Sequence, residues 1–107
     1  AEAFAVIEKS GLDPQAFYDM ITGSAFGCPV YQNYGQLLVN KDWNEAAFKL
    51  ELGLKDVRLA QSTAEDADAN MQLGNLLERR FETAVANGHG DKDWTAVAID
   101  IRAEAGL

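Results

Sequence analysis

One lysine stands among positions that are otherwise apolar. When residues 45–67 are placed at about 100° per residue, as in an α-helix, Lys55 falls within roughly 60° of Phe48, Leu52 and Leu59. An unpaired buried ammonium is costly, so Lys55 must reach solvent, pair with a carboxylate or contact a ligand, and the rarity of buried charge favours the first two. Asp56 flanks the stripe but diverges from Lys55 by about 100°, which leaves room for a third partner.

Other reactive residues are few. Cys28 and His89 are the sole cysteine and histidine, too few for a Cys/His zinc site, and no structural metal is expected. A nucleophilic Cys28 would need a basic partner, whereas His89 lies in a glycine turn expected in solvent. Residues 23–28 hold two glycines four apart but match no phosphate-binding loop. A tight helix connection is the favoured interpretation, and a close approach to a ligand is the alternative.

Charge and hydropathy narrow the class of protein. Seventeen acidic against nine basic residues give 107 residues a net charge of -8, which disfavours binding to nucleic acid. No stretch approaches about 18 consecutive apolar residues and no signal peptide is recognisable. We therefore expect a cytoplasmic protein that does not bind a membrane.

Helical periodicity dominates the chain, which predicts one all-α domain over residues 1–107. The elements that must hold Lys55 begin and end at recognisable signals. The first three predicted helices are residues 1–10, ending at Gly11, a helix that is capped by Asp13-Pro14 and ends at Gly23, and a helix that starts at Pro29 and ends before residues 40–44. The other three are a helix over about 45–67, a helix over 71–87 that ends at Gly88, and a last helix that starts at Trp94 and is capped by Asp93. The helix over 45–67 is apolar on more than one side, so we expect it to be sandwiched between others.

Three segments together resemble a known family. Phe48 followed by Lys55-Asp56-Val57-Arg58-Leu59-Ala60 resembles the Phe…Lys-Asp-x-x-Leu-Ala signature in the helical C-terminal domain of β-hydroxyacid dehydrogenases, typified by 3-hydroxyisobutyrate dehydrogenase. Residues 1–13 resemble the end of that family's long interdomain helix, and residues 90–94 resemble its Gly-x-x-Asp-aromatic turn. The resemblance spans nearly the whole chain and implies the fold of the 6-phosphogluconate dehydrogenase C-terminal domain.

The resemblance also implies a function and a site. It implies an oxidoreductase in which an N-terminal Rossmann domain binds NAD or NADP and this domain closes the cleft over a small hydroxy acid. Residues 1–10 would end the interdomain helix, whose catalytic lysine pattern is not found here and would fall before residue 1. Lys55 matches the family lysine that contacts the dinucleotide, while Phe48 and Asp56 match positions that line the cleft. The chain alone is expected to be inactive.

A second class of function remains open at this point. The same fold could serve as a non-catalytic helical dimerisation module, in which Lys55 and Asp56 are only structural. Association is expected in either case, and we predict a homo-oligomer. The identity of the hydroxy acid, and the choice between NAD and NADP, depend on the Rossmann half.

Overall fold

The computed structural model describes all of residues 1–107 and contains only helices, turns and loops. Helices α1 to α6 span Glu2–Lys9, Pro14–Thr22, Pro29–Asn40, Leu50–Asp66, Gln72–Ala84 and Val97–Glu104, with a π-helical turn η1 at Val85–His89 and a 3₁₀ turn η2 at Trp94–Ala96. The sole β feature is an isolated antiparallel bridge between Lys49 and Asp93. The predicted all-α class is confirmed.

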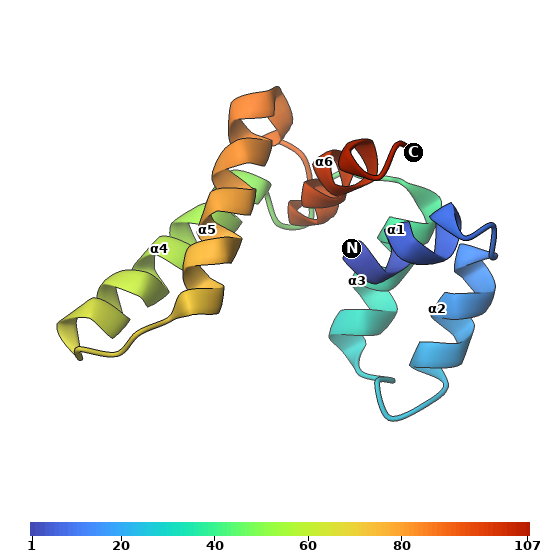
Figure 1. Cartoon of the computed structure of the whole chain (residues 1–107), viewed down its shortest axis with the longest axis horizontal. Coiled ribbons are helices and arrows are strands. Elements are labelled where there is room, and N and C mark those ends of the chain that lie inside the picture. The colour runs from blue at the N-terminus through green and yellow to red at the C-terminus, as the bar shows by residue number, and fades with distance from the viewer. The chain divides into compact units, whose positions relative to one another are not determined.

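The chain divides into two compact units. The first comprises Ala1–Trp43 and Ala98–Leu107, with α1, α2, α3 and nearly all of α6, and the second comprises Asn44–Val97, with α4, α5, η1 and η2. Figure 1 shows α4 and α5 running side by side as a hairpin. The residues of the predicted site all belong to the second unit.

The first unit begins and ends its helices at the predicted signals. Gly11 adopts φ +75°, and the Leu12 amide donates to the Ile7 carbonyl across the end of α1 at 3.1 Å. Asp13 caps α2 by accepting from the Gln15 amide at 3.0 Å. The turn between α2 and α3 is tight, because a Cβ on Gly27 would lie 2.3 Å from the Thr22 carbonyl oxygen. The favoured interpretation of residues 23–28 as a helix connection therefore fits the structure.

Aromatic side chains pack the helices of the first unit together. The rings of Phe4 and Phe17 meet edge to face with centroids 5.1 Å apart, joining α1 to α2. The Tyr18 ring lies over Gly35, where an added Cβ would approach it to 2.9 Å, and the Tyr18 hydroxyl donates to the Gln32 carbonyl at 2.9 Å. A small residue at position 35 is therefore what lets α2 and α3 approach closely.

The second unit is built on α4 and α5, and α4 starts later than predicted. The sequence predicted a helix from about residue 45, whereas α4 begins at Leu50. Residue Lys49 is extended, at φ -66° and ψ 143°, and the Leu50 and Glu51 amides donate to the carbonyls of Lys92 and Gly90 at 2.9 and 3.1 Å. The first amides of α4 are therefore satisfied by a turn some forty residues away, which local sequence does not reveal.

The α4/α5 hairpin holds a small apolar core of Leu50, Leu54, Phe81 and Ala84. Gly53 makes room for it, because a Cβ at Gly53 would lie only 2.8 Å from Cε1 of Phe81. On one edge Arg58 of α4 pairs with Glu78 and Glu82 of α5, at 3.1 and 2.6 Å. The two helices are thus joined by both apolar burial and ion pairs.

The end of α5 and the start of the last helix follow the predicted punctuation with small differences. The helix gives way to η1, in which Gly88 adopts φ +86°, and the chain then turns to Asp93. Asp93 caps η2 by accepting from the Thr95 amide at 3.0 Å, as predicted, and α6 follows from Val97. The last helix therefore opens as a 3₁₀ turn before it becomes an α-helix.

Candidate functional site

The predicted site is placed on the side of α4 that faces away from α5. Leu50, Gly53 and Leu54 are buried toward α5, whereas Leu52 and Leu59 remain 42% and 57% exposed. Helical geometry puts Lys55 between those two leucines on the same outer face. Within this unit α4 packs against α5, η2 and η1 but leaves the face of Leu52 and Leu59 exposed, so the expectation that it is sandwiched is met only in part.

Lys55 and Asp56 are both exposed, and neither makes an ion pair or a side-chain hydrogen bond. The sequence left three possibilities for Lys55, namely solvent, a carboxylate partner or a ligand, and in this chain its ammonium reaches solvent. The stripe itself is open, so the ammonium carries no burial cost. Such an ammonium, beside two exposed leucines, fits a ligand that carries anionic groups next to a flat apolar part.

Phe48 does not belong to the helix, and its ring lies on the buried side of α4, where Cε1 would be 3.6 Å from a Cβ on Gly53. Because α4 begins at Leu50, Phe48 belongs to the segment that precedes it, and the predicted helical spacing from Phe48 to Lys55 is wrong. Its ring is half-buried and meets Trp94 edge to face, with centroids 6.4 Å apart. The structure thus keeps Leu52, Lys55 and Leu59 on one face and sets Phe48 at the base of the helix.

Asp93 is tied more closely to this site than the sequence suggested. Its side chain is fully buried, and Oδ1 accepts from both the amide and the hydroxyl of Thr95, at 3.0 and 2.7 Å. The other oxygen, Oδ2, lies 3.5 Å from the Phe48 amide. The sequence predicted the cap but not the link to Phe48, because nothing in local patterning pairs residues 45 positions apart.

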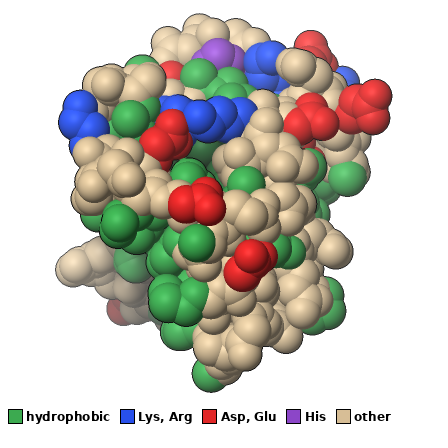
Figure 2. Space-filling view, turned by 90° about the vertical axis from the view of Figure 1, so that its right-hand side faces the viewer, with side chains coloured by type: hydrophobic (Ala, Val, Ile, Leu, Met, Phe, Trp, Pro, Cys, Tyr) green, Lys and Arg blue, Asp and Glu red, His purple; other side chains and the backbone are tan.

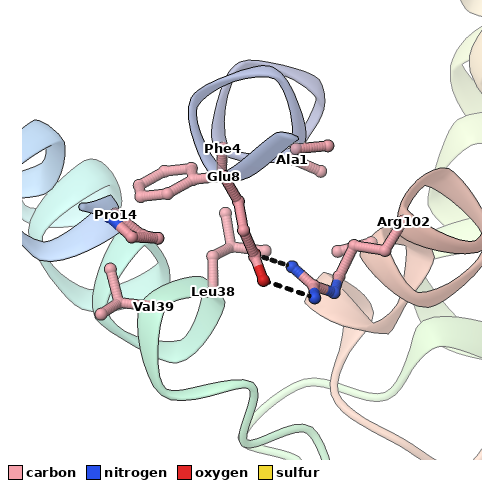
Figure 3. A pocket seen from close by; sticks show the side chains of 9 residues that line it. Ala1, Phe4, Glu8, Pro14, Leu38, Val39 and Arg102 are labelled. Carbon is pink, nitrogen blue, oxygen red and sulfur yellow. Dashed lines mark hydrogen bonds and ion pairs between the residues drawn. The ribbon is translucent and has the colours of Figure 1, made fainter. Parts of the chain in front are cut away.

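The first unit contains a cluster of charged side chains, of which Glu8 and Arg102 are drawn in Figure 3. Glu8 on α1 receives a forked pair of hydrogen bonds from Arg102 on α6 (Figure 3), one of them at 2.9 Å. Lys41 adds a third contact to Glu8 at 2.8 Å. These cations hold the pKa of Glu8 at about 2, chiefly through the Arg102 hydrogen bonds and then through Lys41. The cavity beside them measures about 10 Å³, roughly the space of one water molecule, so it offers no room for an organic ligand.

The remaining surface shows no assembled reactive centre. On the face shown in Figure 2, hydrophobic side chains reach the surface in several places between polar and charged ones. No three or more His, Cys, Asp or Glu side chains are grouped so as to hold a metal ion. An open polar pocket of about 340 Å³ lies at the turn between α4 and α5, lined by residues that include Gln61, Glu65 and Asn75. None of the helices has the length and apolarity needed to cross a membrane.

Comparison with known proteins gives one consistent set of relatives. The family described as NAD-binding of NADP-dependent 3-hydroxyisobutyrate dehydrogenase matches residues 1–99. The chain is 41% identical over 97 residues to an uncharacterized oxidoreductase of Bacillus subtilis, covering 91% of this chain and 34% of the relative. It is 32% identical over 112 residues to a probable 3-hydroxyisobutyrate dehydrogenase of Mycobacterium tuberculosis, covering 98% and 37%.

A solved structure agrees with these relatives. The crystal structure of 3-hydroxyisobutyrate dehydrogenase from Salmonella typhimurium superposes with a TM-score of 0.82 at 26% sequence identity, covering 90% of this chain and 33% of that one. The chain therefore spans about a third of the length of the relatives it matches. The resemblance drawn from the Lys-Asp helix and its neighbouring segments is confirmed.

Proposed function

Because the chain belongs to the family of NADP-dependent 3-hydroxyisobutyrate dehydrogenases, we propose that it is the helical C-terminal domain of a two-domain oxidoreductase. Its partner in that enzyme is an N-terminal Rossmann domain, and the two domains enclose a cleft for NAD or NADP and a small hydroxy acid. The helical domain supplies one wall of that cleft and a surface for association into a homo-oligomer. The whole enzyme oxidises the hydroxy acid reversibly to its semialdehyde or keto form.

The observation that carries this proposal is the outer face of α4. Lys55 stands there without a counterion, between the exposed side chains of Leu52 and Leu59. A dinucleotide offers phosphate oxygens that an ammonium can bind, next to planar rings that pack on apolar side chains. We assign Lys55 to the phosphate-bearing part of the cofactor, and Phe48 and Asp56 to the lining of the cleft near it.

These positions assign a separate role to the cofactor, to the residues of this chain and to the Rossmann domain. The bound nicotinamide cofactor supplies hydride transfer when it is present. Lys55 binds and orients it through charge, while the leucines beside Lys55 exclude water from the contact. This chain contributes no glycine-rich phosphate loop of its own, so the remaining contacts to the cofactor come from the Rossmann domain.

The test is the Lys55→Ala variant of the full-length protein, assayed by steady-state kinetics with varied NAD or NADP. A charge-assisted hydrogen bond is worth about 1.5 to 3 kcal/mol, so we expect cofactor affinity to fall on the order of ten- to a hundred-fold. The Michaelis constant of the cofactor should rise more than turnover falls, because the contact is made in ground and transition states alike. Thermal stability should change little.

Two controls sharpen this experiment. Lys9→Ala removes another exposed helical lysine, from α1, and should leave the Michaelis constant of the cofactor unchanged. Lys55→Arg keeps the positive charge and should recover most of the lost affinity. Normal cofactor affinity in Lys55→Ala would end the assignment of this face to the cofactor.

A second candidate function draws on a different surface. Three leucines of α5, Leu73, Leu76 and Leu77, are 65%, 47% and 48% exposed on consecutive turns. An exposed apolar stripe of this kind favours a helical dimerisation module. If association were the sole function, substitution of these leucines by Gln would abolish the oligomer in sedimentation, and Lys55→Ala would have no kinetic effect.

A further inference from the structure

Asp93 has more structural connections than a helix cap requires. A capping side chain needs one acceptor oxygen, and Ser, Thr or Asn serve as well as Asp. Here Oδ1 alone satisfies the cap, through the Thr95 amide and hydroxyl. The carboxylate is nevertheless fully buried, a placement that is costly for a charged group and needs compensating contacts. The cap therefore does not explain the role of the second oxygen, Oδ2.

That second oxygen points to the segment that leads into α4. Oδ2 lies 3.5 Å from the Phe48 amide, and the Phe48 carbonyl accepts from the Trp94 amide at 2.9 Å. The backbone of Phe48 is thus held at both its polar groups by consecutive residues of one turn. The same turn accepts from the Leu50 amide through the Lys92 carbonyl, at 2.9 Å.

Side chains reinforce the backbone contacts. The rings of Phe48 and Trp94 meet edge to face at 81°, so the phenyl ring is fixed as well as the main chain. Trp94 in turn packs against the core of the hairpin that contains Leu50 and Leu54. Phe48 and the first turn of α4 are therefore anchored to residues 90–94.

The anchored segment sets the direction of α4. Lys55 lies five residues after the first helical residue, about 7.5 Å along the axis, and its side chain is exposed without an ion pair or hydrogen bond of its own. The position of its ammonium therefore depends on the base of the helix as well as on the packing of α4 against α5. A shift of about 1 Å at a charged contact can cost up to a hundred-fold in rate.

We propose that Asp93 is a positioning residue for the cofactor site, which holds Phe48 and the base of α4 so that Lys55 meets the dinucleotide. The proposal rests on the proposed function of Lys55 and adds the residue that orients it. Asp93 itself touches neither cofactor nor substrate. It acts by accepting two hydrogen bonds from Thr95 on one oxygen and by facing the Phe48 amide with the other.

The experiment compares Asp93→Asn with Thr95→Ala in the full-length protein. Asn keeps one acceptor oxygen, so it either caps η2 or faces Phe48, and its amide group cannot accept at the other place. We expect the Michaelis constant of the cofactor to rise on the order of tenfold, with a smaller change in turnover. Thr95→Ala removes one bond to Oδ1 and leaves the Phe48 contact in place, so it should lower thermal stability without raising that Michaelis constant.

Coupling to Lys55 separates positioning from a merely structural role. If Asp93 acts through Lys55, the double variant Asp93→Asn/Lys55→Ala should show the cofactor affinity of Lys55→Ala alone. If the double variant instead lost affinity by the product of the two single losses, the proposal would be overturned. Equal Michaelis constants of the cofactor in Asp93→Asn and the wild type would overturn it as well. Should Asp93→Asn fail to fold, Asp93→Ser serves instead, because its hydroxyl caps η2 but does not reach Phe48.

The outcomes also distinguish this proposal from the function on which it rests. Normal cofactor affinity in Lys55→Ala would remove the cofactor site, and the role of Asp93 with it. Reduced affinity in Lys55→Ala together with normal affinity in Asp93→Asn would overturn the role of Asp93 alone.

Discussion

At the scale of single residues, Glu8 is the side chain whose pKa is shifted most clearly by its neighbours. The Arg102 guanidinium binds it with two hydrogen bonds and the Lys41 ammonium with one, so that its pKa falls from an ordinary 4.5 to about 2. Because the folded pKa lies below the unfolded one, the carboxylate contributes stability above pH 4.5 and loses that contribution as the pH falls toward 2. The three side chains come from α1, α6 and the residue after α3.

We expect Glu8→Gln to destabilise the chain at neutral pH, and we expect this loss to shrink to a small fraction by pH 2, where the carboxylate is about half protonated in the folded chain. Part of the carboxylate is exposed, so solvent screening reduces its contribution to about 1 to 2 kcal/mol. Urea denaturation of both proteins at several values between pH 7 and pH 2 measures the difference. A difference that stayed constant over this range would show that the carboxylate charge is not responsible.

At the scale of elements, the helix ends in this chain could be predicted where they depend on neighbouring residues. Gly11 with its positive φ and Asp13 before a proline are local signals, and both ends were predicted from them. The start of α4 was not, because its first amides bond to the carbonyls of Gly90 and Lys92. The same tertiary contacts displaced Phe48 from the helical face on which its spacing had placed it.

The pairing of α4 with α5 gives a prediction about Gly53. Replacing Gly by Ala inside a helix normally stabilises by about 1 kcal/mol. Here the new Cβ would stand 2.8 Å from the buried ring of Phe81, and overpacking of that kind costs roughly 1 to 3 kcal/mol. We expect Gly53→Ala to be net destabilising by about 1 kcal/mol in chemical denaturation.

A double-mutant cycle identifies the cause of that loss. Phe81→Leu removes the atoms that the new Cβ would meet, so Gly53→Ala should cost less, or become stabilising, in the Phe81→Leu background. A stabilised Gly53→Ala single variant would mean that the ring moves aside freely. An unchanged cost in the double variant would place the strain elsewhere.

At the scale of the whole molecule, the sequence predicted the fold class and the family but not the surroundings of the site. Composition and periodicity were enough for an all-helical chain, and the Lys-Asp helix pointed to the family that the comparisons show. The sequence did not predict that the leucines on the outer face of α4 are exposed, because a buried helical face and an open one can have the same leucine-rich pattern. The roles of Lys55, Phe48 and Asp56 stay predictions.

The division into two units makes the chain a test of folding cooperativity. Trp43 lies in the first unit and Trp94 in the second, and there is no third tryptophan. The largest fully buried side chains, Leu50 and Asp93, both belong to the second unit, so we expect the first unit to have the lower free energy of unfolding. In urea, the fluorescence of Trp94→Phe, which reports the first unit, should therefore change at a lower concentration than that of Trp43→Phe. Coincident midpoints would mean that all 107 residues unfold in one step, with the two units opening together.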